Sequence, residues 1–118
     1  MMKYTLLAAL FIASTSGFAA TKAKKEILLD NADVEVIRAT YPAGSESGVH
    51  THVYANRVVY FVKGGVLAIT PEDTSKPDRI ITVKDGQTLY MPGVTHNVKN
   101  IGDTEIIIVE TEIKHSQK

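Results

Sequence analysis

The feature that most constrains the fold is a series of short runs rich in β-branched and aromatic residues, with no helix-like periodicity between them. Residues of these types favour extended strands. The expected strands cover residues 25–29, 34–40, 57–62, 66–70, 79–83, 87–91 and 105–113. Many short strands at this spacing predict an all-β sandwich or barrel.

Turn-forming residues separate the expected strands. Gly64-Gly65 predicts a two-residue hairpin loop, because glycine tolerates the positive φ that such loops demand, and Asp85-Gly86 follows the same logic. Pro92-Gly93 and Gly102-Asp103 are further turn signals, and the polar segment 71–78 is expected to be a surface loop. No internal repeat or linker interrupts the series, so we expect a single small domain.

The N-terminus has the order of a secretory signal peptide. A charged start at Lys3 is followed by an apolar run over 4–13 and by small residues over 14–20. Gly17 and Ala19 occupy the −3 and −1 positions, so we expect residues 1–19 to be a signal peptide, with 20–118 as the mature domain. A retained anchor would need about 20 apolar residues, and a lipoprotein would need a cysteine. We therefore expect a periplasmic protein that leaves the membrane after cleavage.

Composition excludes several classes of function. The 118 residues include 13 basic and 13 acidic side chains, and removal of the signal takes away one basic residue, Lys3, and no acid. A chain without excess positive charge is not expected to bind nucleic acid. The absence of cysteine excludes disulfides and thiol chemistry, and no serine-hydrolase or phosphate-loop motif is present. A mature domain of this size is large enough to bury a core without such cross-links.

Three of the four histidines are placed to bind a metal ion. His50 and His52 are two residues apart, so an extended segment would carry both on one face, about 7 Å apart along the strand. His96 follows the Pro92-Gly93 turn and can reach the same point from a facing strand. Three imidazole nitrogens form a common site for a divalent transition metal. His115 lies in a polar C-terminal tail and is expected to be solvated.

Two blocks of sequence around these histidines resemble the two motifs of the cupin superfamily. The first block runs Gly44, five residues, His50-Thr51-His52, four residues, Arg57, six residues, Gly64. The second runs Gly86, five residues, Pro92-Gly93, two residues, His96, three residues, Asn100. The resemblance implies a jelly-roll β-barrel of the cupin type. It extends weakly to small stand-alone cupins, which commonly form homodimers and of which some are linked to degradation of small amino or carboxylic acids.

The chain departs from the cupin pattern at two places. The second motif is one residue short between Pro92 and Gly93, which should tighten the turn before His96. More seriously, Arg57 occupies the position of the glutamate that joins the three histidines as a metal ligand in the family. Arg57 could turn away from the barrel, pair with an acid (Glu46, Glu110 or Glu112), or bind an anionic ligand shared with the metal; alternatively, the site holds no metal.

The sequence therefore predicts one divalent metal ion (Zn, Fe, Ni or Cu) on His50, His52 and His96, with Arg57 as a substrate-binding residue. The absence of the charged oxygen ligand, because Arg57 replaces the glutamate, disfavours Mn and Mg. The function that follows is metal-dependent chemistry on a small, possibly anionic organic molecule, of the dioxygenase or isomerase kind. The alternative is a non-catalytic module that binds a metal or a small molecule.

Strand alternation puts Arg57, Val59 and Phe61 on one face and Tyr60 on the other.

Overall fold

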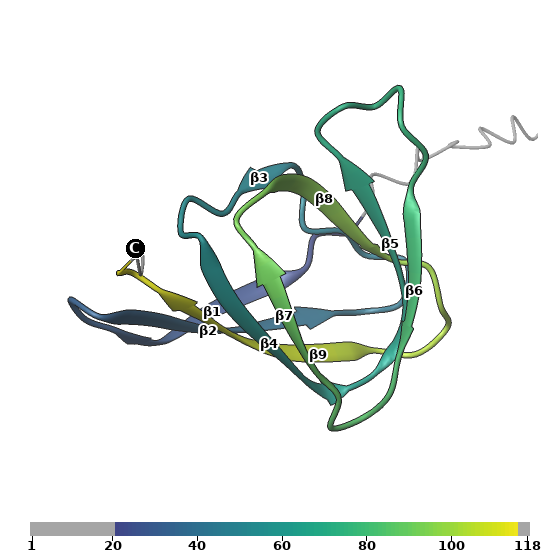
Figure 1. Cartoon of the computed structure of the whole chain (residues 1–118). Helices are drawn as coiled ribbons and strands as arrows, with labels where there is room; N and C mark the ends of the chain where they lie inside the picture. The colour runs from purple at the N-terminus through teal and green to yellow at the C-terminus, as the bar shows by residue number, and fades with distance from the viewer. Residues whose placement is uncertain (1–20, 116–118) are drawn as a thin grey trace, which may run out of the picture.

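The computed structural model describes residues 21–115 as nine strands, and every paired strand runs antiparallel to its neighbour (Figure 1). The predicted start of the domain at residue 20 and the predicted signal peptide lie outside the described residues. The strands are β1 (Lys24–Asp30), β2 (Val34–Tyr41), β3 (His50–Thr51), β4 (Asn56–Lys63), β5 (Gly65–Pro71), β6 (Arg79–Val83), β7 (Thr88–Pro92), β8 (Thr95–Asn100) and β9 (Ile106–Ile113).

The strands form two sheets that enclose the core. One sheet has the order β1-β2-β9-β4-β7 and the other β3-β8-β5-β6, and Figure 1 shows the two as opposite walls of a barrel. Phe61 and Val59 of the first sheet pack with Leu67 and Val98 of the second, and all four are buried. The all-β jelly-roll expected from the sequence is confirmed.

All seven strands expected from β-branched runs are present, within a few residues of their predicted ends. Two observed strands were not predicted: β3 and β8. Their sequences, HT and THNVKN, are short and polar, and they carry the histidines. Burial of alternate residues in β8 shows why such a segment is a strand, because His96, Val98 and Asn100 face the interior.

The predicted hairpin at Gly64-Gly65 is wrong. β4 and β5 belong to different sheets, so these glycines lie where the chain crosses from one wall of the barrel to the other. Neither has positive φ. They are needed for close packing instead: a Cβ on Gly64 would lie 2.1 Å from the Val83 carbonyl oxygen, and one on Gly65 would lie 2.8 Å from Ile106 Cγ1.

Gly86 has the predicted positive φ, at 81°. Its turn also connects two different sheets, because β6 belongs to one wall and β7 to the other. The backbone N–H of Gly86 donates to the Phe61 carbonyl oxygen at 2.6 Å. The turn after β6 is thereby tied to β4, close to the glycine crossover that follows β4.

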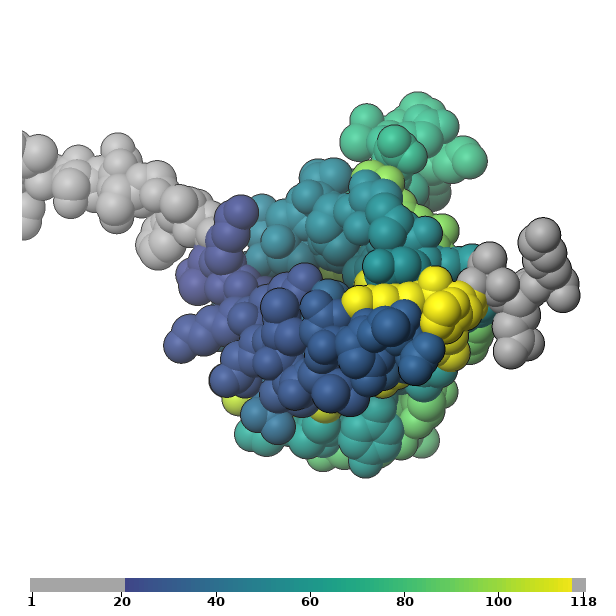
Figure 2. All heavy atoms as spheres, turned by 90° about the vertical axis from the view of Figure 1, so that its left-hand side faces the viewer, coloured from purple at the N-terminus to yellow at the C-terminus, as the bar shows by residue number. Residues whose placement is uncertain are grey.

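Two surface features are relevant below. Strand β1 is exposed along its whole length, pairs only with β2 among the described strands, and lies across the face turned to the viewer in Figure 2. The loop at 72–78 between β5 and β6 projects from the top of the barrel in Figures 1 and 2, as the sequence predicted. Among the described residues there is no helix of the length and apolarity that a bilayer crossing requires.

Candidate metal centre

The backbone brings the three histidines together by pairing β3 with β8. His50 lies directly opposite His96 in this ladder, so the two come from neighbouring strands and not from strands that face each other across the barrel. His52 follows β3, and its backbone N–H donates to the Val94 carbonyl oxygen at 2.8 Å. Gly93 permits this approach, because a Cβ there would lie 2.7 Å from the His52 carbonyl oxygen. The shortened turn therefore positions His52 as well as His96.

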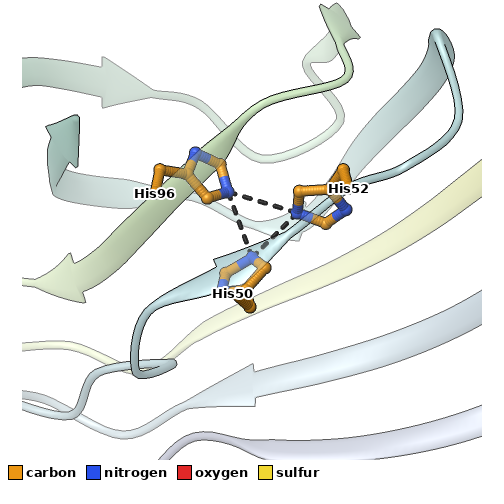
Figure 3. A group of neighbouring side chains, drawn as sticks. All are labelled: His50, His52 and His96. Carbon is orange, nitrogen blue, oxygen red and sulfur yellow. Dashed lines mark hydrogen bonds between the residues drawn. The ribbon is translucent and has the colours of Figure 1, made fainter. Parts of the chain in front are cut away.

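The side chains converge on one point through their Nε2 atoms, as Figure 3 shows. The Nε2 atoms are 2.8 Å apart for His50 and His52, 3.2 Å for His52 and His96, and 3.1 Å for His96 and His50. Three nitrogens bound to one ion at about 2.0–2.1 Å, with angles of about 90–109°, would be about 2.8–3.4 Å apart. The observed triangle fits that arrangement.

Hydrogen bonds on the far sides of two rings determine which nitrogen carries the proton. His50 Nδ1 lies 2.8 Å from the Gly48 carbonyl oxygen, which can only accept, so Nδ1 donates. His52 Nδ1 donates in the same way to the Glu112 carboxylate. With the proton on Nδ1, the neutral form of each ring presents a lone pair at Nε2; these two Nε2 atoms lie 2.8 Å apart, and Arg57 Nη1 also lies 2.8 Å from His52 Nε2. A metal ion between the rings would take such lone pairs as its ligands.

The surroundings keep the rings of His52 and His96 uncharged. Burial, followed by the Arg57 charge, lowers the pKa of His52 to about 3. Burial, followed by the neighbouring His50, lowers the pKa of His96 to about 3 as well. Only the neutral imidazole can bind a metal through Nε2. The donor set therefore fits a divalent transition metal at neutral pH.

Arg57 points into the barrel and is 2 % exposed. Its Nη1 donates to Glu110 Oε1 at 2.7 Å and to His52 Nε2 at 2.8 Å. Of the alternatives that the sequence left open, the structure shows pairing with an acid, and the partner is Glu110. Burial raises the pKa of Glu110, and the Arg57 guanidinium opposes that shift. The pair places one positive and one negative charge beside the histidines.

The other two candidate acids have different roles. Glu112 orients His52 through Nδ1, which fixes the ring and makes it a better ligand. Glu46 is remote from Arg57 in its contacts, since it accepts a 3.3 Å hydrogen bond from Asn97 Nδ2. Alternation along β9 places Glu110 and Glu112 on the interior face. This alternation is the feature of the sequence that could have identified both as residues of the site.

Two hollows flank the histidines. The first, of about 370 Å³, includes His50, His52, Glu110 and Glu112 in its wall. Tyr41 also lines it; this buried residue was not singled out in the sequence, and burial, followed by Glu110, raises its pKa to about 12. The Tyr41 hydroxyl therefore stays protonated. The second hollow, of about 480 Å³, adjoins Arg57 and His96.

Several other polar residues are not part of the centre. Tyr60 and Tyr90 are exposed, as alternation predicted for Tyr60. His115 is exposed and contacts Asp33 at 2.8 Å. Asn100 is fully buried and donates to the carbonyl oxygens of Tyr41 and Thr104, so it secures the β8–β9 connection.

Comparison with known proteins agrees with this architecture. The family model for Cupin matches residues 12–117. The beta-alanine degradation protein BauB of Pseudomonas aeruginosa is 38% identical over 89 residues, which are 75% of this chain and 90% of that protein.

Solved structures give the same result. A cupin domain of Bordetella pertussis is 32% identical with a TM-score of 0.75, over 84% of this chain and all of that one. A double-stranded β-helix protein of Klebsiella pneumoniae, at 18% identity and a TM-score of 0.63 over 79% of this chain and 77% of that one, shares the fold. On the strength of the family model, these relatives and the two-sheet barrel described above, the chain belongs to the cupin family.

Proposed function

We propose that this cupin holds one divalent transition metal ion on His50, His52 and His96 and acts there on a small organic acid. The observation that carries the proposal is the convergence of the three Nε2 atoms, which lie 2.8–3.2 Å from one another. The three nitrogens form a compact group. A cation at their centre would bind all three.

The donor set favours Zn, Fe, Ni or Cu. All three ligands are imidazoles, which suit these metals better than Mg or Mn. The two nearby carboxylates are already engaged, Glu110 with Arg57 and Glu112 with His52. When bound, such an ion supplies Lewis acidity toward an oxygen of the substrate.

The residues around the centre suit a small, polar substrate. Tyr41 offers a protonated hydroxyl beside the first hollow, and Arg57 keeps an Nε donor that has no partner among the described residues. The name of the Pseudomonas relative, a beta-alanine degradation protein, supports a small amino or carboxylic acid as the class of substrate.

We further propose that the protein is exported to the periplasm as a homodimer. Residues 1–19 have the order of charge, apolar run and small residues that a signal peptide requires. The exposed edge of β1 offers a surface for a second copy.

Elemental analysis of the purified protein tests the metal site. We expect about one transition-metal ion per chain, and His96→Ala should lose most of it because one of three ligands is gone. His115→Ala is the matched control, since His115 lies outside the centre. Equal metal loss from both variants, or none from His96→Ala, would refute the three-histidine site. Turnover of a small organic acid that requires the metal would identify an enzyme, whereas tight binding without turnover would identify a binding module.

A further inference from the structure

The second hollow is a groove beneath the loop that joins β5 to β6, and it leads to His96. Its volume is about 480 Å³, and apolar side chains including Ile69, Pro71 and Met91 form its wall. The loop between β5 and β6, which projects from the barrel in Figure 1, contributes the exposed Lys76 to the wall. The groove therefore connects solvent to the metal centre along an apolar surface.

The charged groups that line this groove are all cations. They are Arg57, Lys76 and Arg79, and none of the lining residues carries a carboxylate. Arg57 is balanced by Glu110, but among the described residues Arg79 has no acidic partner within ion-pair distance. The groove thus carries a net positive charge that no side chain in its wall neutralises.

The strand register places Arg79 on the inner face of its sheet, although the residue is exposed at the start of β6. In β5 and β6, Arg79 lies directly opposite Ile69, and Ile69 lies opposite Val98 of β8. Opposed residues in a ladder share one face of the sheet, and Val98 belongs to the core. Arg79 is therefore a cation on the face of the sheet that otherwise builds the interior.

We propose that this groove binds a carboxylate with an apolar chain, that Arg79 and Lys76 hold the carboxylate, and that the chain lies along Ile69 and Met91 toward His96. The proposal rests on the proposed function, because it names the substrate class of the same centre. It places the anionic end of the substrate at the rim and the opposite end of the chain at the metal. An arginine fork suits a carboxylate because two N–H groups can donate to its two oxygens.

An inward charge on an edge strand has a second known role, which is to prevent association of sheet edges. β6 is an edge strand of its sheet. The two roles predict different behaviour for an Arg79→Gln variant. Loss of a carboxylate site weakens ligand binding, whereas loss of edge protection leaves ligand binding unchanged and promotes self-association.

The test is to titrate the zinc-loaded protein with hexanoate, butyrate and hexylamine and to measure each affinity by calorimetry. We expect hexanoate to bind, butyrate to bind more weakly by up to about fourfold for each missing methylene, and hexylamine not to bind. Arg79→Gln should weaken hexanoate binding at least about tenfold without loss of zinc. Arg38→Gln is the matched control, because Arg38 lies on the opposite sheet and contacts Glu26.

Several outcomes would overturn the inference. Unchanged hexanoate affinity in Arg79→Gln, or equal binding of hexylamine, would show that Arg79 does not select a carboxylate. Faster sedimentation of Arg79→Gln with unchanged hexanoate binding would assign it to edge protection instead. A protein that holds zinc but does not bind hexanoate would refute this inference and leave the metal site intact. Hexanoate binding by a protein that takes up no zinc would refute the metal site and support the carboxylate groove.

Discussion

Substitution of Glu110 by glutamine should sharply weaken metal binding without removing a metal ligand. Glu110 lies 2.7 Å from the buried Arg57 guanidinium, which itself contacts His52. A single positive charge about 5 Å from a divalent ion is repelled by roughly 7 kcal/mol at an effective dielectric of 20. In the native protein the Glu110 carboxylate offsets this repulsion, and Glu110→Gln removes the offset while conserving shape.

The size of the effect follows from that repulsion. If only a third of the repulsion survives relaxation and water penetration, zinc binding loses about 2 kcal/mol of free energy. The dissociation constant for zinc then rises about thirtyfold. Arg57→Met removes the cation, so it should restore zinc affinity when it is combined with Glu110→Gln. The double variant also avoids an unpaired buried charge, whereas breaking one side of a buried pair typically costs about 3–5 kcal/mol of stability.

The assay is competition for zinc with a chelator at neutral pH, for the native protein, both single variants and the double variant. Thermal unfolding of the metal-free proteins verifies that each is folded at the assay temperature. Glu105→Gln is the matched control, because Glu105 is partly exposed and contacts Lys63 at the surface. Native zinc affinity in Glu110→Gln would refute the charge-balance reasoning. So would a double variant that binds zinc as weakly as Glu110→Gln.

Three further predictions concern other parts of the chain. Protein recovered from cells should begin at or next to Ala20, and N-terminal sequencing that finds Met1 on a membrane-bound species would contradict export. Sedimentation should show a dimer that Ile27→Lys dissociates. Antiparallel pairing of β1 with a second copy, centred on Ile27, sets the exposed Ile27 opposite its own copy and Lys24 opposite Asp30; a monomeric native protein would exclude this. Gly64→Ala should lower the free energy of unfolding by at least about 2 kcal/mol, since its Cβ would meet the Val83 carbonyl oxygen. Gly102→Ala, whose Cβ has no neighbour nearer than 3.5 Å, is the control in denaturant unfolding, and equal values for the two would contradict the packing argument.

The fold was predictable because seven of its strands are runs rich in β-branched and aromatic residues. The same rule missed β8, whose histidine, asparagine and lysine residues are not typical of strands but whose alternate positions face the core. The glycines marked positions where one strand ends and the next begins, but the sequence did not show why glycine is needed there. Gly64 and Gly65 serve as points of close contact between the sheets and not as turn residues with positive φ, and only the packed neighbours reveal that difference.

The grouping of the three histidines was predictable, but their surroundings were not. The spacing of His50, His52 and His96 predicted that the three side chains meet, and in the structure they do. The fate of Arg57 depended on which acid faces it, and that depends on the register between β4 and β9. Sequence periodicity does not fix such a register between distant strands. The pairing of Glu110 with Arg57 and of Glu112 with His52 therefore needed the folded chain.

The centre draws on both walls of the barrel. All three histidines belong to the β3–β8 side, whereas Arg57, Glu110 and Glu112 extend from β4 and β9 of the opposite sheet. An ion bound by the histidines would strengthen the His52–Glu112 contact and so fasten one wall to the other. Ligands that bind only the folded state stabilise it in proportion to the logarithm of their concentration. The lifetime of this protein against proteolysis would then report how much free metal its compartment contains.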